Sequence, residues 1–211
     1  MNFEFINVEQ NTDEWYALRA GKLTSSNLSK VMANLGKAFG EPAKKYAVNI
    51  AIEQITGNPI SSNYSNDHME RGHEQEPIAR NLYEQEMFCE VTNGGFFDGG
   101  FIGCSPDGLL EDGVIEIKSV IPSVHFANIK RGSVDPAYKW QCIGNLQYTD
   151  REWLDFISFC ADFPEDKQLF THRLYAEKLT EEFKILNDRT HEFESLVNDT
   201  KQLILKSNYI T

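Results

Sequence analysis

Hydrophobic and polar residues alternate with a period of two across residues 114–119, which predicts a β-strand with two different faces. Ile115 and Ile117 lie on one face, whereas Glu116 and Lys118 project side by side from the other. Charged side chains are rarely buried unless they are paired or bind an ion. An acid and a lysine on an otherwise apolar strand are therefore candidate catalytic or ion-binding residues.

A tight turn is expected just before this strand, because Asp112-Gly113 is a strong hairpin signal. Upstream of the turn, the apolar residues 101–104 lead into the turn-prone run Ser105-Pro106-Asp107-Gly108. Asp107 is therefore expected on the neighbouring arm of a β-hairpin, where it would approach the acid and the lysine of the strand.

The remaining pattern predicts helices first, then a set of strands, and then one closing helix. Helical patterns cover residues 12–20, 24–34, 42–55, 68–87, 124–131, 136–150 and 180–206, with a kink or a fresh start at Pro77. Strands are expected at residues 3–8, 89–92, 95–104, 114–119, 153–161 and 169–176, and residues 61–66 form a polar loop. This order predicts an α/β fold with a central mixed β-sheet flanked by helices.

Composition indicates one domain that spans residues 1–211, since 41% of the 211 residues are hydrophobic. No apolar stretch approaches the roughly 20 residues that cross a bilayer, and the first residues lack the features of a signal peptide. The four cysteines are widely spaced and form no C-x-x-C pair, so a zinc or iron–sulfur cluster is not expected. We therefore expect a cytosolic protein with reduced thiols.

The net charge of −12 argues against a simple nucleic-acid binder, because phosphate neutralisation usually supplies most of the affinity. The charge is nevertheless uneven. The basic residues that gather locally are Lys22, Lys30, Lys37, Lys44, Lys45, Lys130, Arg131 and Lys139. A basic stripe can coexist with an acidic metal site and an acidic exterior, although for most single lysines a solvated face is the simpler interpretation.

Asp107, Glu116 and Lys118 together form the pattern D-x8-E-x-K. Carboxylate oxygens are ligands for hard divalent cations, and a lysine beside them can act on a phosphate or a water molecule. This set is the minimum needed to hold a divalent metal ion against a phosphodiester. An edge strand with a solvated polar face also explains an isolated E-x-K, and from the residues alone both interpretations stay open.

A phosphate site is a second possibility, at the end of the first predicted helix. Arg19 is followed by Thr24-Ser25-Ser26 at the start of the next helix. Helix N-termini offer free N–H groups, and arginine makes charge-assisted hydrogen bonds to phosphate oxygens. A capping cluster with a surface arginine is the alternative, and the residues alone favour it.

Three further residues have an ambiguous role. Glu76 lies four residues after Gly72 on the same face of its predicted helix, so it could add a third carboxylate to a metal site. His73 could be a ligand, although an isolated histidine is more often a surface residue. Gln141 could donate to a phosphate or a water, or it could be a polar residue on a packed helix.

Taken together, these residues resemble the YqaJ-like viral recombinase family, the lambda-exonuclease branch of the PD-(D/E)xK nucleases, over about residues 12–150. The resemblance is carried by Trp15-x3-Arg19-x-Gly21-x2-Thr24-x-Ser26, Gly72-x3-Glu76, Ser105-Pro106-Asp107-Gly108-Leu109, Glu116-Ile117-Lys118 and Gln141. It implies a restriction-endonuclease-like core. The sequence departs from the family pattern in its shorter N-terminus, its acidity and residues 141–148, where only Gln141 and nearby spacing match.

The resemblance also implies residue roles. Asp107 and Glu116 would be the principal Mg²⁺ ligands, with the backbone carbonyl of Ile117 as a further ligand. Glu76 would support the metal site, and Lys118 would orient or activate the attacking water. The pocket for a 5′-terminal phosphate would be formed by Arg19, Ser26, Ser105 and Gln141. Hydrolysis would use two ions per active site, with Mn²⁺ as a substitute for Mg²⁺.

The resemblance implies a homotrimer that digests one strand of duplex DNA from the 5′ end, as other members of the family do. They leave a 3′ overhang for a single-strand annealing protein during phage-type recombination, in the cytosol of a bacterial host. The alternatives are an endonuclease of the same superfamily, such as a junction resolvase or a restriction-type enzyme, and a non-catalytic DNA-binding relative. An acidic DNA-mimicking interaction module is a third possibility, but it would not need the arginine, hydroxyl and glutamine set.

Overall fold

The computed structural model describes residues 3–60 and 67–207, without the side chains of residues 67–70 and 73. Its elements are β1 (Glu4–Ile6), α1 (Asp13–Arg19), β2 (Leu23–Thr24), η1 (Ser25–Asn27), α2 (Leu28–Met32), α3 (Glu41–Thr56), α4 (Asp67–Met87), β3 (Phe96–Asp98), β4 (Ile102–Cys104), β5 (Gly108–Leu109), β6 (Gly113–Ser119), α5 (Pro122–Arg131), α6 (Lys139–Tyr148), β7 (Trp153–Phe159), β8 (Leu169–Tyr175) and α7 (Thr180–Lys206). The loop expected at residues 61–66 lies outside the described residues.

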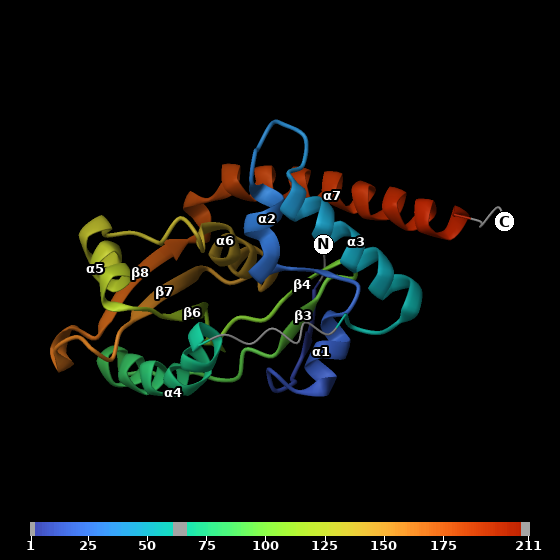
Figure 1. Ribbon diagram of the computed structural model, residues 1–211. Helices are drawn as coiled ribbons and strands as arrows, with labels where there is room; N and C mark the ends of the chain where they lie inside the picture. Colours follow the sequence, from blue (N-terminus) through green and yellow to red (C-terminus); the bar gives the residue numbers. More distant parts are fainter. Residues whose placement is uncertain (1–2, 61–66, 208–211) are drawn as a thin grey trace.

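The strands form two mixed sheets, with the orders β1-β3-β4-β2 and β5-β6-β7-β8. In the second sheet β6 pairs with β7 in parallel, and the outer strands β5 and β8 pair antiparallel. Parallel neighbours need a crossover connection, which α5 and α6 provide here. The expected α/β class with a mixed sheet and flanking helices is confirmed, but the strands divide between two sheets (Figure 1).

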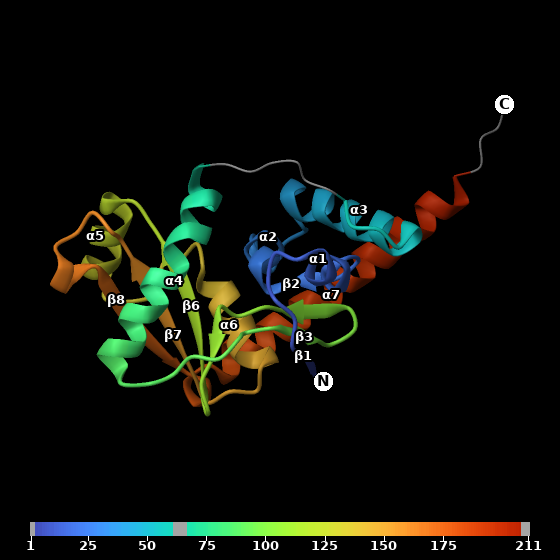
Figure 2. The ribbon, with the colours of Figure 1, turned by 90° about the horizontal axis from the view of Figure 1, so that it is seen from below.

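Helices cover both faces of the β5–β8 sheet, with α4 on one side and α6 and α7 on the other (Figures 1 and 2). Ile115 and Ile117 of β6 pack into the core cluster that includes Tyr83 of α4. Val114 belongs to the opposite cluster, which contains Leu146 of α6 and Phe193 of α7. The period-two pattern of β6 therefore produces the two-faced strand that the sequence predicts.

The first helix follows the predicted signals closely. The Thr12 hydroxyl accepts a hydrogen bond from the Trp15 backbone N–H at 3.3 Å, and the chain turns at Gly21 with a φ of +74°. Trp15 is buried against Val8 and Phe96. Pairing of β2 with β4 in parallel then brings the end of α1 next to the hairpin that carries Asp107.

Two predicted strands are wrong in detail. Residues 95–104 form the antiparallel pair β3 and β4 rather than one strand, because the chain reverses at Gly99-Gly100, where Gly100 has a φ of +86°. Residues 89–92 form no strand; Thr92 makes one isolated bridge to Leu109. At residues 95–104 a glycine turn divides the apolar run into two strands. Residues 89–92 form a short loop that makes only the one bridge.

Helix α4 is continuous through Pro77, so the helix does not restart there. A buried polar cluster holds it on the sheet: the Tyr83 hydroxyl donates to Asp155 Oδ2 at 2.7 Å. Arg173 of β8 donates to both oxygens of the same aspartate, at 2.7 and 2.6 Å. Because Asp155 on β7 is fully buried, this arrangement fixes α4 against β7 and β8.

Helix α7 has the predicted bounds and is amphipathic. Leu186, Phe193 and Val197 are buried against the core, whereas Leu203 and Leu205 near its end are exposed. Among the described residues, no helix combines the length and the apolar character that crossing a membrane requires.

Candidate active site

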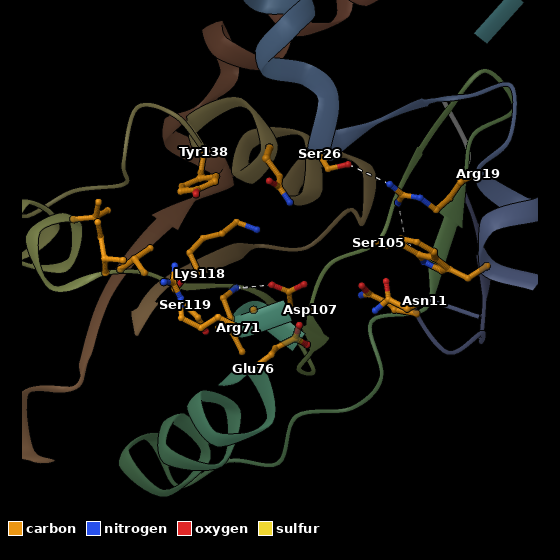
Figure 3. Close-up of a pocket in the computed structure, with 18 residues that line it drawn as sticks. Asn11, Arg19, Ser26, Arg71, Glu76, Ser105, Asp107, Lys118, Ser119 and Tyr138 are labelled. Atoms are coloured by element: carbon orange, nitrogen blue, oxygen red, sulfur yellow. Dashed lines mark hydrogen bonds between the residues drawn. The ribbon is translucent and has the colours of Figure 1, made fainter. Parts of the chain in front are cut away.

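A cavity of about 770 Å³ lies where α1, α4, the end of β6 and the start of α6 meet (Figure 3). It is lined by eight of the nine residues to which the family resemblance assigns a role, namely Arg19, Ser26, Glu76, Ser105, Asp107, Ile117, Lys118 and Gln141. The ninth, Glu116, is fully buried and contacts two lining residues. Figure 3 shows two groups of lining residues, one with Arg19, Ser26 and Ser105 and the other with Glu76, Asp107 and Lys118.

The predicted hairpin positions Asp107. The chain turns between β5 and β6, and the Leu110 N–H donates to the Gly113 carbonyl at 2.9 Å. The Asp107 N–H donates to the Ile115 carbonyl at 3.1 Å, and the Ile117 N–H donates to Asp107 Oδ2 at 2.6 Å. The carboxylate is thus held against β6 by the backbone itself, with its second oxygen directed toward the cavity side of the hairpin (Figure 3).

Replacing Gly94 with alanine is expected to destabilise this hairpin. A Cβ at Gly94 would overlap the carbonyl group of Pro106, the residue before Asp107, and backbone cannot move aside as a flexible side chain can. We expect the free energy of unfolding, measured by urea denaturation, to fall by about 1–3 kcal/mol.

Gly72→Ala is the matched control, because among the described residues no atom outside its own helical turn lies within 4 Å of its added Cβ, and the residue is inside α4. A helical glycine replaced by alanine is expected to stabilise by about 0.5–1 kcal/mol. Equal stability of the Gly94→Ala variant and the unsubstituted protein would contradict the close approach.

Glu116 is fully buried, and both of its carboxylate oxygens accept hydrogen bonds. Lys118 Nζ and Gln141 Nε2 donate to Oε1, each at 2.5 Å. Asn145 Nδ2 donates to Oε2 at 2.6 Å. Because Gln141 and Asn145 are four residues apart, they lie on one face of α6 and reach the same carboxylate. Lys118 also lies over the Tyr138 ring, 5.1 Å from its centroid.

Glu76 enters the site from α4 and is paired with Arg80 of the same helix. Arg80 Nη2 lies 2.9 Å from Glu76 Oε1 and also donates to the Asp107 backbone carbonyl at 2.6 Å. One guanidinium therefore connects the helix-borne acid to the hairpin, and it sets the position of α4 relative to Asp107.

The acids of this buried region lie close together, and this changes their pKa values. Burial and the Asp107 carboxylate raise the pKa of Glu116 to about 8 and that of Glu76 to about 7. Burial also raises the pKa of Asp107. Burial alone would lower the pKa of Lys118, but the carboxylates of Glu116 and Asp107 outweigh it, so this pKa lies above its ordinary value.

Raising the pH without divalent cations is therefore expected to lower the contribution of these acids to stability. The folded protein keeps protons on Glu76 and Glu116 up to about 7 and 8, whereas an ordinary glutamate titrates at 4.5. The stability that these protonated acids contribute is fully present below pH 4.5 and is lost as the pH rises through 7 and 8. The loss is up to about 1.4 kcal/mol per pH unit for each group. Denaturation at a series of pH values measures it. Glu116→Gln should flatten the upper part of the curve, and an unchanged slope in this variant would contradict the assignment.

The donor chemistry of the acidic group fits a divalent cation. Among the described residues, no three acidic, histidine or cysteine side chains are grouped so that they could hold a metal ion, and Glu116 and Glu76 are hydrogen-bonded to Lys118 and Arg80. Even with these cations present, the pKa values of both glutamates stay raised. Glu76, Asp107 and Glu116 lie close enough to raise one another's pKa, and their oxygens are ligands of the kind that hard divalent ions prefer.

At the other end of the cavity, Arg19 lies in a polar cluster. Its guanidinium lies 3.9 Å from the centroid of the Trp15 ring and donates to Ser26 Oγ at 3.2 Å and to Ser105 Oγ at 3.5 Å. Trp15 Nε1 also donates to Ser105 Oγ, at 2.8 Å. Burial lowers the pKa of Arg19, yet arginine remains charged in proteins. Over the described part of the chain, no carboxylate lies within ion-pair distance of this half-buried cation, which therefore suits an anionic ligand.

The hydroxyls after Arg19 do not act as a helix cap, so the capping alternative is wrong. Residues 25–27 form the short 3-10 helix η1, which has no side-chain capping bond from Thr24, and only then does α2 begin. Thr24 and Ser26 instead bond to each other at 3.2 Å and to Arg19. The helix predicted at residues 24–34 is therefore a 3-10 turn followed by five residues of α-helix.

Comparison with known proteins places the chain in a family. The model of the YqaJ-like viral recombinase domain matches residues 14–152, about two thirds of the chain. The chain belongs to the YqaJ-like viral recombinase family. The matched range contains every candidate site residue from Arg19 to Gln141, and it agrees with the range over which the sequence motifs resemble the family.

Solved structures agree with this YqaJ-like assignment. The alkaline exonuclease LHK-Exo from Laribacter hongkongensis is 32% identical, with a TM-score of 0.77 over 93% of this chain and 100% of that one. Its complex with dAMP gives a TM-score of 0.78 at the same identity and coverage. A phage-related exonuclease from Haemophilus somnus 129PT, at 15% identity and a TM-score of 0.64 over 89% and 96% of the two chains, shares the fold. No curated protein matches the sequence. The restriction-endonuclease-like fold and the enzymatic class, a nuclease, are confirmed.

Sequence reasoning missed several residues of the YqaJ-like site, and it named Trp15 in a motif without giving it a role. Arg80 and Asn145 contact the acids directly, and Trp15 supports Ser105 and Arg19. A helical spacing of four residues from Glu76 and from Gln141 could have indicated Arg80 and Asn145. Arg71, which also lines the cavity, gave no comparable signal.

Gly72 and His73, near the start of α4, are two further residues that the sequence analysis considered. Gly72 lines the cavity, and no atom from another described element lies within 4 Å of the position that a Cβ would take there. The side chain of His73, considered as a metal ligand, lies outside the described part of the structure.

Proposed function

We propose that this protein is a metal-dependent exonuclease that degrades one strand of linear double-stranded DNA from the 5′ end and leaves a 3′ overhang. The observation that carries the proposal is one cavity with two different ends. One end has a half-buried arginine, unpaired by any carboxylate among the described residues, and the other has buried acids with a lysine. A 5′-terminal phosphate bound at the arginine end would place the adjoining phosphodiester at the other end, beside the acids and the lysine. Both exonuclease relatives and the family assignment support this reading.

Asp107 and Glu116 are proposed to hold Mg²⁺, with Mn²⁺ as a substitute, and two ions are expected in each site. Glu76 and the carbonyl of Ile117 would complete the oxygen donors. Bound Mg²⁺ would supply a more acidic water for attack and neutralise charge on the leaving oxygen. The raised pKa values of Glu116 and Glu76 support this role, because acids that repel one another bind a cation readily once deprotonated.

Lys118 is proposed to act as a cation rather than as a general base. A base must give up its proton near the working pH, but the neighbouring carboxylates keep the pKa of Lys118 above its ordinary value. A protonated Lys118 at the cavity wall can orient the attacking water and stabilise negative charge on the phosphate.

We propose that the 5′-terminal phosphate is bound by the guanidinium of Arg19 and the hydroxyls of Ser26 and Ser105. Each cut would expose a new 5′ phosphate, which the same residues would then bind, so the enzyme would advance one nucleotide at a time. Gln141 lines the cavity but donates to Glu116 Oε1, and we propose that it turns to the phosphate when substrate is present.

The wider biological setting is proposed from the family. Residues 1–211 would act as one nuclease domain, three copies would form a ring around DNA, and a single-strand annealing protein would take the overhang. The protein would work in the cytosol of a bacterium, encoded by a phage or a prophage. Sedimentation of the purified protein measures the number of copies.

Digestion of a linear duplex labelled at either the 5′ or the 3′ end, with and without Mg²⁺, tests the proposal. We expect immediate release of the 5′ label, a late release of the 3′ label and no cleavage in EDTA. Closed-circular plasmid should remain intact. Cleavage of the plasmid would favour an endonuclease of the same superfamily, and absence of any cleavage would favour a non-catalytic relative.

A further inference from the structure

Asn145 is buried in the core beneath the cavity and has no obvious reason to be polar. It is fully buried on α6, yet it does not line the cavity, and its Oδ1 has no hydrogen-bond partner among the described residues. An unsatisfied buried acceptor costs stability, so an apolar side chain would be expected at this core position. The one polar contact of its side chain, from Nδ2 to Glu116 Oε2 at 2.6 Å, is therefore the feature that needs an explanation.

The two oxygens of Glu116 have partners of different kinds. Oε1 is bonded to Lys118 and Gln141, both of which line the cavity and have space to move into. Oε2 is bonded to Asn145, which is enclosed on all sides by the core. A charged or cavity-facing donor can be displaced from Glu116, whereas the neutral and enclosed amide stays in place.

We propose that Asn145 is a positioning residue that anchors Oε2 of Glu116 and so presents Oε1 to a divalent cation. This proposal rests on the proposed metal-dependent function. A short, rigid asparagine fixes the plane of the carboxylate, and its neutral amide neither repels a cation nor competes for it. Partners of this kind, bonded to a ligand and not to the ion, set the orientation of metal-binding side chains.

The test compares the cation affinity of the purified protein with that of Asn145→Ala and Asn145→Leu, titrated with MnCl₂ or MgCl₂ in a calorimeter without DNA. The leucine variant keeps the number and branching of the side-chain heavy atoms, whereas the alanine variant leaves a cavity, so a shared effect of both variants separates loss of the hydrogen bond from a packing defect. We expect both variants to bind the cation about 10-fold more weakly or worse. Cleavage rates should recover partly at high cation concentration, because the chemical groups remain.

Gln147→Ala is the matched control. Gln147 is an amide on the same helix that donates to Asn187 of α7 at 3.0 Å rather than to the site, so its loss tests the packing of α6 alone. We expect its cation affinity to equal that of the unsubstituted protein, even if its melting temperature falls.

Each outcome is decisive. Unchanged cation affinity in folded Asn145→Ala or Asn145→Leu would overturn the positioning role while leaving the nuclease proposal intact, provided that the unsubstituted protein still cleaves DNA with Mg²⁺. Failure of both variants to fold, checked by circular dichroism, would assign Asn145 to stability and also overturn the role. An unsubstituted protein that neither binds the cation nor cleaves would refute the proposed function itself.

Discussion

Asp107→Ala is expected to reduce Mg²⁺-dependent cleavage by on the order of a thousandfold or more, since metal-ion catalysis supplies several kcal/mol of transition-state stabilisation. The substitution removes a buried carboxylate from the acidic group and leaves Glu116 with less repulsion from its neighbour. We therefore also expect a lower pKa for Glu116 and a weaker calorimetric signal for cation binding. Single-turnover digestion of a 5′-labelled duplex measures the rate.

Asp107 also accepts the Ile117 N–H, so part of the effect could be structural. Asp107→Asn keeps an oxygen for that hydrogen bond while removing the charge, and it should be folded and equally inactive. Glu111→Ala, an exposed acid in the same hairpin, is the matched control and should cleave normally. Cleavage at the unsubstituted rate by a folded Asp107→Asn protein would remove Asp107 from the metal site.

Arg19→Ala is expected to abolish the preference for a 5′-phosphorylated end over a 5′-hydroxyl end. Hydrogen bonds to charged groups contribute about 1.5–3 kcal/mol, which corresponds to a selective loss of roughly 10- to 150-fold in kcat/KM on the phosphorylated substrate. Cation binding should be unchanged, because Arg19 lies at the far end of the cavity from the acids (Figure 3). The ratio of kcat/KM on the two substrates measures the preference.

Arg19→Lys and Lys22→Ala refine this experiment. Lysine keeps the charge but loses the planar fork that bonds Ser26 and Ser105, so an intermediate preference is expected. Lys22 is paired with Asp98 at 3.0 Å and does not line the cavity, so its removal should leave the ratio unaltered. An equal loss on both substrates in Arg19→Ala would count against a phosphate pocket.

The hairpin and the two faces of β6 could be predicted from sequence because their causes are local. An Asp-Gly turn fixes the register of β5 against β6, and a period of two then fixes which side chains share a face. The same holds for α1, where a Thr12 cap and Gly21 define both ends. These local rules were enough to bring Asp107 and Lys118 to one cavity.

Other features depend on contacts that no local pattern encodes. The division into two sheets follows from the parallel pairing of β2 with β4, which joins residues almost 80 positions apart. The hydroxyls of Thr24 and Ser26 looked like a cap because a sequence gives no sign that Arg19 competes for them. Likewise, Gln141 bonds to Glu116 only because the crossover between β6 and β7 lays α6 across that face of the sheet.

The cluster of Tyr83, Asp155 and Arg173 has a consequence for how substitutions would be distributed in a genetic screen. Helix α4 carries Glu76 to the cavity and Arg80 to the backbone of Asp107, but its attachment to the sheet lies further along, at Tyr83. Damage at that attachment would shift two site residues at once without touching DNA. Inactive mutants are therefore expected to map to this remote anchor as well as to the cavity, and compensating changes should arise along the shared helix.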